Sequence, residues 1–280
     1  MRKISEKQII TIVASLCVKA NMHLRPDIVT AFKKARISES SDRAKKILSE
    51  LLENARVARR ENIALCQDTG LPVVFVDVGR DVDVSGVDLN RAIREGVKLG
   101  YARGYLRNSI VPDPLKRLNP TQSTPPVIHF DFGRHKGLKI TVLPKGFGSE
   151  NKTKLGMLSP TQSNAEIKDF IVNAVKEAGP DACPPYVLGI GIGGSADYAA
   201  LLAKKALLRP VHRRNSKKYV AQMEKELFKE INDLSIGPMG LGGKSTVLGV
   251  NILTYPTHMA GLPVCVNVSC HALRSASDCL

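Results

Sequence analysis

The sequence has no tryptophan, and aromatic residues make up only 5% of its 280 residues. This scarcity argues against a nucleic-acid-binding surface that stacks bases on aromatic rings, although the formal net charge is +15. The 41 Lys and Arg residues are spread along amphipathic segments such as 43–60 and 204–229, and aromatic residues are not interleaved with them in a stacking pattern. A solvated basic surface that attracts anionic substrates is therefore favoured over nucleic-acid binding.

Long hydrophobic runs are also absent, and none approaches the roughly 20 apolar residues that a membrane-spanning helix needs. The first seven residues are mostly charged or polar and lead into an amphipathic helix, unlike the apolar core of a signal peptide. We therefore expect a soluble cytoplasmic protein that does not bind membranes.

The cysteines form no Cys-x-x-Cys pair, so neither a zinc ribbon nor a thioredoxin-like redox site is indicated. Disulfides are not expected in a chain that lacks an export signal. Each cysteine is then either a small buried apolar residue, which is the usual case, or a ligand that the fold brings together with others. The six are Cys17, Cys66, Cys183, Cys265, Cys270 and Cys279.

The apolar pattern is helical over about the first 60 residues and mixed afterwards. Ser5 is placed to cap a first helix, and another follows Ser40-Ser41-Asp42. Neither an internal repeat nor a low-complexity linker is present, so we predict one α+β domain over 1–280, with 1–62 a mostly helical subregion. Later predicted strands cover 73–78, 127–132, 138–143, 186–192, 246–253 and 263–268, and later predicted helices cover 88–102, 165–178, 195–208 and 216–234.

A polar segment, Cys66-Gln67-Asp68-Thr69-Gly70, comes directly before the first predicted strand. A thiol, an amide and a carboxylate at the entrance of a strand are typical of a functional loop. The alternative is a capped turn, in which Asp68 makes an Asx-type hydrogen bond and Gly70 supplies a positive φ. Spacing alone favours the turn.

Two glycine-rich segments are similar to nucleotide-binding motifs. Residues 189–194 match G-x-G-x-x-G between a predicted strand and helix, but 209–214 carries arginines where an acidic ribose ligand belongs. Because NADP could use arginines there, a dinucleotide-binding oxidoreductase stays an alternative. Residues 237–246 end like a P-loop, yet Pro238 replaces the first glycine and a β-rich stretch follows, which excludes an NTPase.

Histidine, cysteine and arginine flank the last predicted strand. His258 precedes this strand, and Cys270, His271 and Arg274 follow it. A single histidine is more often structural than catalytic, so each residue alone is as consistent with a structural role as with a functional one.

Taken together, these segments resemble, in the same order, the motifs of class I (iron–sulfur) fumarate hydratases. The alpha subunit of L-tartrate dehydratase is similar too. The resemblance spans nearly the whole chain, and the joint set is specific although no single motif is. The matching segments are 66–70, 148–151, 191–194, 203–210, 237–243 and 270–274.

The resemblance implies a 4Fe–4S cluster held by Cys66, Cys183 and Cys270, since thiolates suit such clusters. One iron would have no protein ligand and would act as a Lewis acid on substrate oxygens. The implied enzyme is a hydro-lyase for a small dicarboxylate. The leading reaction is reversible hydration of fumarate to L-malate, a step of the tricarboxylic acid cycle, and L-tartrate dehydration to oxaloacetate is the alternative.

The resemblance also implies roles for five residues around the substrate. Asp68 and His258 would bind the substrate hydroxyl or shuttle its proton. Arg107 would clamp a carboxylate bidentately. Gln67 would contact the substrate as well, and backbone N–H groups near Gly148 would hold its other carboxylate.

Two features differ from what members of this family often show. Their glycine-rich loop often reads Gly-Gly-Gly-Ser-Glu-Asn, whereas Phe147 interrupts it here and has less freedom in φ than glycine, so we expect a different substrate fit at this loop. The chain also stops soon after Arg274. The resemblance therefore implies a heteromer, in which a beta-type subunit carries the C-terminal hydro-lyase domain and the base for carbon deprotonation.

Overall fold

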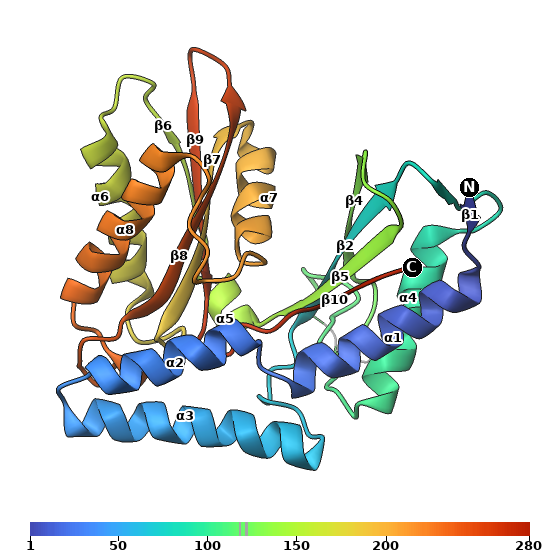
Figure 1. Ribbon diagram of the computed structural model, residues 1–280, viewed down its shortest axis with the longest axis horizontal. Helices are drawn as coiled ribbons and strands as arrows, with labels where there is room; N and C mark the ends of the chain where they lie inside the picture. Colours follow the sequence, from blue (N-terminus) through green and yellow to red (C-terminus); the bar gives the residue numbers. More distant parts are fainter. Residues whose placement is uncertain (118, 121–122) are drawn as a thin grey trace. The chain divides into compact units, whose positions relative to one another are not determined.

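The protein forms two compact units, each assembled from separate segments of the chain (Figure 1). The computed structural model describes residues 1–117, 119–120 and 123–280. Helices and mixed sheets occur together, and a helical N-terminal region precedes them, which confirms the α+β prediction. A single domain over 1–280, with 1–62 as its helical subregion, stays a prediction. Unit 1 comprises Met1–Arg25, Ala55–Phe147 and Arg274–Leu280, and unit 2 comprises Pro26–Asn54 and Gly148–Leu273.

Unit 1 contains a four-stranded sheet packed against two helices. Its elements are α1 (Glu6–Met22), β2 (Leu71–Gly79), α4 (Leu89–Arg103), β4 (Val127–Gly133), β5 (Leu138–Lys145) and β10 (Ala276–Cys279), with a small parallel pair β1 (Arg2–Lys3) and β3 (Val82–Asp83). The strand order is β10-β5-β2-β4, in which β2 runs parallel to β4 and antiparallel to β5. Helices α1 and α4 pack against each other, and α1 also contacts β5 and β10.

Local sequence signals determine where the helices of unit 1 begin. Ser5 and Gln8 form a capping box at the start of α1, and Asp88 accepts the Arg91 N–H at 2.9 Å at the start of α4. Both beginnings were predicted from the sequence and are confirmed. Alternate residues of the central strands enter one core with these helices because strand side chains have a period of two. They are Val74, Val76, Val78, Leu138, Ile140 and Val142.

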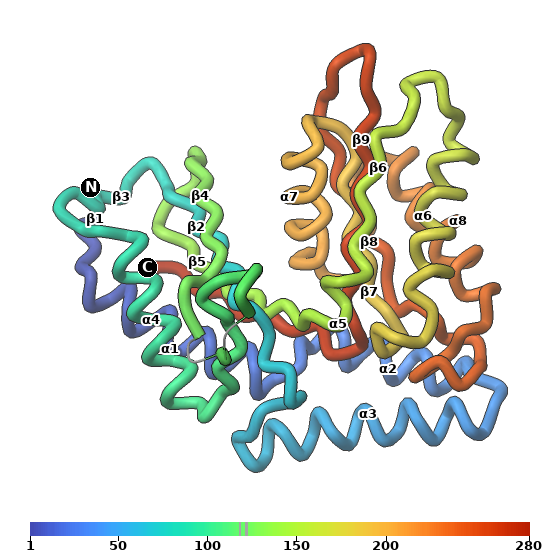
Figure 2. Tube along the Cα trace, turned by 180° about the vertical axis from the view of Figure 1, so that it is seen from behind, coloured from blue at the N-terminus to red at the C-terminus, as the bar shows by residue number. Residues whose placement is uncertain are grey.

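Unit 2 contains a second four-stranded sheet, of order β6-β9-β7-β8, with helices on both faces. Figures 1 and 2 both show α6 and α8 on one face and α7 on the other. Its elements are α2 (Pro26–Ser38), β6 (Lys154–Leu158), α6 (Asn164–Ala178), β7 (Tyr186–Gly194), α7 (Ala196–Ala206), α8 (Lys218–Asp233), the 3₁₀ turn η1 (Pro238–Gly240), β8 (Val247–Thr257) and β9 (Leu262–Ser269). The residues of α3 (Asp42–Glu61) and α5 (Phe147–Glu150) are divided between the units.

The glycines of the G-x-G segment allow α7 to lie close against β7. A Cβ atom at Gly191 would stand 2.0 Å from the Ala199 carbonyl oxygen, and one at Gly189 would stand 2.1 Å from that of Ala203. Arg209, one of the arginines considered for NADP, donates instead to the fully buried carboxylate of Glu224. Helix packing and a buried ion pair thus account for the two features that suggested dinucleotide binding.

The glycine-rich turn 237–246 leads into β8 and not into a helix, which confirms that it is no P-loop. Glu39, which is buried, closes the turn by accepting the Lys244 N–H at 2.8 Å and the Ser40 N–H at 2.9 Å. Burial alone would raise the pKa of Glu39, but the backbone N–H groups of Ser41, Ser40 and Lys244 together lower it below its ordinary value.

The remaining predicted strands and helices are found, with ends shifted by a few residues. The short elements β1, β3, α5, β6, η1 and β10 were not predicted. None of the helices within the described ranges combines the length and the apolar character needed to span a membrane.

Candidate active site

Cys66, Gln67 and Asp68 lie on the loop of unit 1 that joins α3 to β2. The half-buried Cys66 thiol donates to Gln67 Oε1 at 3.4 Å, and the Gln67 side chain is exposed. Asp68 Oδ1 accepts the Gly70 N–H at 2.9 Å, which is the Asx-type bond expected from the sequence. Its Oδ2 accepts the Phe147 N–H at 2.8 Å. The same carboxylate of Asp68 therefore both closes the turn and is held in a fixed position by hydrogen bonds.

Three buried side chains hold this loop in place. The Tyr101 hydroxyl, on α4, donates to the carbonyl oxygens of Thr69 at 2.9 Å and Gly70 at 3.1 Å. The Arg274 guanidinium donates to the Asp68 carbonyl oxygen. Thr69, Tyr101 and Arg274 are 2%, 1% and 3% exposed. Sequence reasoning did not assign roles to them, although Thr69 and Arg274 stood within the matching motifs; Tyr101 carried no such signal.

Arg107 is attached to the same loop through Thr69. Its N–H donates to Thr69 Oγ1 at 3.1 Å, and the Thr69 hydroxyl donates back to the Arg107 carbonyl oxygen at 3.3 Å. Arg107 is exposed, and no carboxylate of the described residues pairs with its guanidinium. Unit 1 therefore brings four predicted site residues together, namely Cys66, Gln67, Asp68 and Arg107.

Unit 2 places Cys183 and Cys270 at the same end of two neighbouring strands. Cys183 lies just before β7 and Cys270 directly after β9, and Val187 of β7 stands opposite Ser269 of β9. The His271 N–H donates to the Cys183 carbonyl oxygen at 3.1 Å, which ties the two segments together. Burial raises the pKa of the adjacent Tyr186 phenol, and the charges of both thiols act in the same direction.

Cys183 has a positive φ of 55°, which is uncommon for a residue with a side chain. Both thiols are half-buried and neither forms a disulfide. Non-glycine residues in such a conformation cluster at functional sites, where the surrounding structure enforces them. The strained cysteine beside a second thiol therefore marks this end of the sheet as a candidate ligand pair.

Gly148 and Phe147 begin the short helix α5. Gly148 is exposed, and a Cβ atom there would have no neighbour within 4 Å. Phe147 lies in the helix without a positive φ, so the loop accommodates it with no need for glycine's freedom. The described backbone thus shows no strain where the sequence departs from the family pattern.

His258 lies in the exposed turn between β8 and β9, where its Nδ1 accepts the Ala260 N–H at 3.2 Å. The eight residues of β9 separate this turn from Cys270. At about 3.3 Å per residue, the separation is roughly 25 Å. Unit 2 therefore does not bring His258 to its two thiols, and the catalytic role of His258 stays a prediction.

The six cysteines fall into three groups by environment, namely buried, half-buried and exposed. Burial raises the pKa of Cys17 to about 12 and that of Cys265 to about 11, which disfavours the thiolate that a metal ligand requires. Cys279 is exposed. Within the described ranges, no three His, Cys, Asp or Glu side chains converge on one point as a metal site. The chemistry of the donors nevertheless fits an iron–sulfur cluster: Cys66, Cys183 and Cys270 are half-buried thiols beside strand ends.

Comparison with known proteins shows the family of the chain. The family model described as "Fumarate hydratase (Fumerase)" matches residues 10–278. The chain belongs to this fumarate hydratase family. The resemblance noted in the sequence is therefore confirmed. The chain is of the hydro-lyase type shared by fumarate hydratases and tartrate dehydratase alpha subunits.

Two relatives of this fumarate hydratase family member are similar to it over nearly its whole length. "Putative L(+)-tartrate dehydratase subunit alpha" of Methanocaldococcus jannaschii is 41% identical over 271 residues, which is 95% of each chain. L(+)-tartrate dehydratase subunit alpha of Escherichia coli K12 is 30% identical over 266 residues, covering 94% of this chain and 88% of the relative. Both likenesses run through unit 1 and unit 2.

Proposed function

We propose that this chain is the alpha subunit of a cytoplasmic 4Fe–4S-dependent hydro-lyase that reversibly hydrates fumarate to L-malate. The observation that carries the proposal is the loop from Cys66 to Gly70. It presents a thiol, an amide and a carboxylate together, and hydrogen bonds of the buried Tyr101, Thr69 and Arg274 side chains hold it in place. Membership of the fumarate hydratase family supports the same reaction class.

Cys66, Cys183 and Cys270 would hold the cluster. When bound, it would supply a Lewis acid, through an iron that has no protein ligand, for the hydroxyl of a 2-hydroxy acid. The half-burial of these three thiols supports the assignment, as does the resistance of Cys17 and Cys265 to ionisation. Cys66 belongs to unit 1, and Cys183 and Cys270 belong to unit 2.

Asp68 would accept or return the proton at the substrate hydroxyl. Its two carboxylate oxygens each accept one backbone N–H, which orients the group before substrate arrives. Each oxygen retains a second lone pair for a substrate hydroxyl. Arg274 fixes the Asp68 backbone from inside the unit.

Arg107 would bind a substrate carboxylate, since its exposed guanidinium can form two parallel hydrogen bonds. Its backbone attachment to Thr69 sets its place relative to Asp68. Gln67 would donate its amide N–H groups from the same loop, and backbone N–H groups near Gly148 would hold the second carboxylate. His258 is kept as a further candidate for the substrate hydroxyl.

A beta-type subunit would complete the site. The related proteins from Methanocaldococcus jannaschii and Escherichia coli are both named as alpha subunits. We propose that the partner carries the C-terminal hydro-lyase domain and the base that removes the proton from carbon. This chain alone should then retain a cluster but turn over poorly.

L(+)-tartrate is the second candidate substrate, because both of these relatives are named as tartrate dehydratases. Both reactions remove or add water at a dicarboxylic 2-hydroxy acid. The same cluster, carboxylate and arginine would serve each of them.

The test is anaerobic co-expression with a beta-type subunit, followed by iron and sulfide analysis and assays with fumarate, L-malate and L(+)-tartrate. We expect a full cluster and fumarate hydration. Asp68→Asn should keep the cluster but lose most turnover, whereas Asp169→Asn, an exposed change on α6, should lose neither. Turnover of tartrate alone would replace the substrate and keep the mechanism. A stable oxygen-free complex without iron would refute the proposal.

A further inference from the structure

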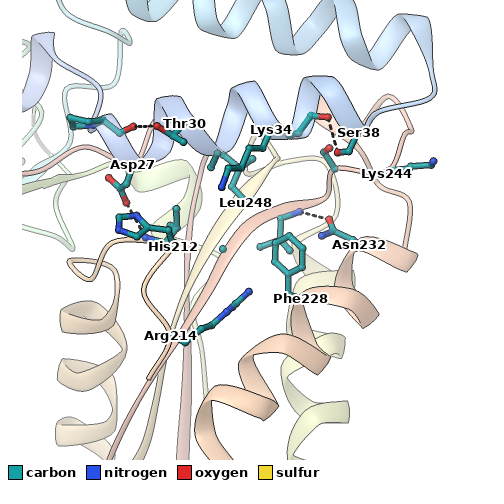
Figure 3. Close-up of a pocket in the computed structure, with 17 residues that line it drawn as sticks. Asp27, Thr30, Lys34, Ser38, His212, Arg214, Phe228, Asn232, Lys244 and Leu248 are labelled. Atoms are coloured by element: carbon teal, nitrogen blue, oxygen red, sulfur yellow. Dashed lines mark hydrogen bonds between the residues drawn. The ribbon is translucent and has the colours of Figure 1, made fainter. Parts of the chain in front are cut away.

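A cavity of about 800 Å³ lies within unit 2, between α2, β8 and the segment that follows α7 (Figure 3). Its volume is within the range of small-molecule sites. None of the residues proposed for the hydro-lyase reaction lines it. Its apolar surface is formed by Ala31 and Ala35 of α2, Val211, Phe228 of α8, and Val247 and Leu248 of β8.

The charged groups of this cavity are mostly cationic. Lys34, Arg214 and Lys244 line it against a single carboxylate, that of Asp27, which accepts the Val211 N–H at 3.0 Å. No carboxylate in the described part of the chain pairs with Lys34 or Arg214. Figure 3 shows Arg214 reaching toward Phe228, whereas Lys244 extends outward from the rim.

Phe228 gives the cavity an aromatic surface beside this charge. The Arg214 guanidinium carbon lies 6.0 Å from the centre of the Phe228 ring. A planar apolar group could lie against the ring while its anionic group meets Arg214 and Lys34. An inorganic anion would leave the apolar surface in water, and a neutral apolar molecule would leave the two cations without a partner.

We infer that this cavity binds a small organic anion, with a carboxylate or phosphate held by Lys34 and Arg214 and an apolar body against Phe228 and Leu248. The glycine-rich turn at one wall of the cavity contacts the segment that contains Cys183. Lys244 and Ser245 end the glycine-rich turn, and at its other end the Met239 N–H donates to the Pro184 carbonyl oxygen at 2.8 Å, next to Cys183.

The experiment is isothermal titration calorimetry on the full-length chain with three probes. Naphthalene-2-carboxylate carries both charge and apolar body, naphthalene-2-carboxamide has only the body, and inorganic phosphate has only the charge. We expect the carboxylate to bind at least about tenfold tighter than either of the others, because charge-assisted hydrogen bonds add to apolar burial.

Matched double variants locate the binding. Lys34→Gln with Arg214→Gln should weaken carboxylate binding by at least about tenfold. Lys33→Gln with Arg213→Gln removes the same charge from the adjacent exposed positions, which do not line the cavity, and should change binding less than about twofold. No binding of the carboxylate, equal binding of carboxylate and carboxamide, or equal losses in both double variants would each overturn the inference. Iron content and turnover play no part in this test, so it is independent of the proposed function.

Discussion

The two units hold their candidate residues by different physical means. In unit 1 the Cys66 loop has no regular secondary structure, and hydrogen bonds from Tyr101, Thr69 and Arg274 determine its position. In unit 2 the register of β7 and β9 places Cys183 and Cys270 side by side, with close helix packing behind the sheet. A site held by a few polar atoms can shift without unfolding, whereas a site held by a sheet moves only when the packing fails.

This difference predicts how each unit responds to substitution. Loss of one hydroxyl in unit 1 should alter the geometry of Asp68 at a small cost in stability. Extra volume behind the sheet of unit 2 should instead destabilise the whole unit, because packed interiors have little free space. The predictions below run from the largest expected effect to the smallest.

The largest effect should follow removal of a proposed cluster ligand in either unit. Cys66→Ser, Cys183→Ser and Cys270→Ser should each lose nearly all iron and sulfide in oxygen-free preparations of the heteromer, because a hydroxyl is a poor substitute for thiolate. Cys279→Ser, at an exposed position on β10, should retain both. A Cys183→Ser protein with a full complement of iron would show that the strained cysteine of unit 2 is not a ligand.

A methyl group at Gly191 should test the packing of unit 2. Its Cβ atom would stand 2.0 Å from a backbone oxygen of α7, so we expect Gly191→Ala to lower the free energy of unfolding by about 3 kcal/mol in urea titrations. Gly261→Ala is the control, because a Cβ atom there meets nothing within 4 Å. Equal stability of the two variants would contradict a tightly packed α7.

Glu39 is a polar support within unit 2, so its removal tests whether packing alone holds the glycine-rich turn. Glu39→Gln should cost about 2 kcal/mol at neutral pH, since hydrogen bonds to a charged carboxylate are lost. The exposed change Glu50→Gln in α3 should cost little.

The pH dependence of this effect has a defined direction. The pKa of Glu39 is lowered by backbone N–H groups against the opposing effect of burial. Its contribution is therefore fully present above the unfolded value of about 4.3 and is lost as the pH falls through the folded value. The difference in unfolding free energy between wild type and Glu39→Gln should narrow in urea titrations below about pH 4. A constant difference would rule out this carboxylate as its source.

The smallest change in stability should come from the polar support in unit 1. Tyr101→Phe removes the hydroxyl that donates to Thr69 and Gly70 and should lower the free energy of unfolding by about 1 kcal/mol. Its effect on turnover should be larger, with kcat/KM about tenfold lower, because the loop that carries Asp68 is no longer held in position. Tyr219→Phe, at an exposed position, should change neither quantity. Unchanged turnover in Tyr101→Phe would mean that the other supports suffice.

Features that depend on neighbouring residues were determined by the sequence itself. Ser5 and Asp88 specify where two helices begin, because a cap needs only a side chain and the N–H groups that follow it. Alternation of apolar residues specified the central strands, and Pro238 with the β-rich run after it excluded an NTPase. The motif order also indicated the family, which the match over residues 10–278 confirms.

Contacts between distant segments were decided only by the tertiary structure. Strand β2 lies between β4 and β5, which are consecutive in the chain, and Arg274 reaches Asp68 across 206 positions. The strand β9 holds His258 far from Cys270, which their closeness in sequence does not reveal. Pairing and packing of this kind depend on which surfaces meet after the elements form, whereas periodicity and capping describe each element alone. The residues of the candidate site could therefore be named from the sequence, but the buried side chains that position them could not.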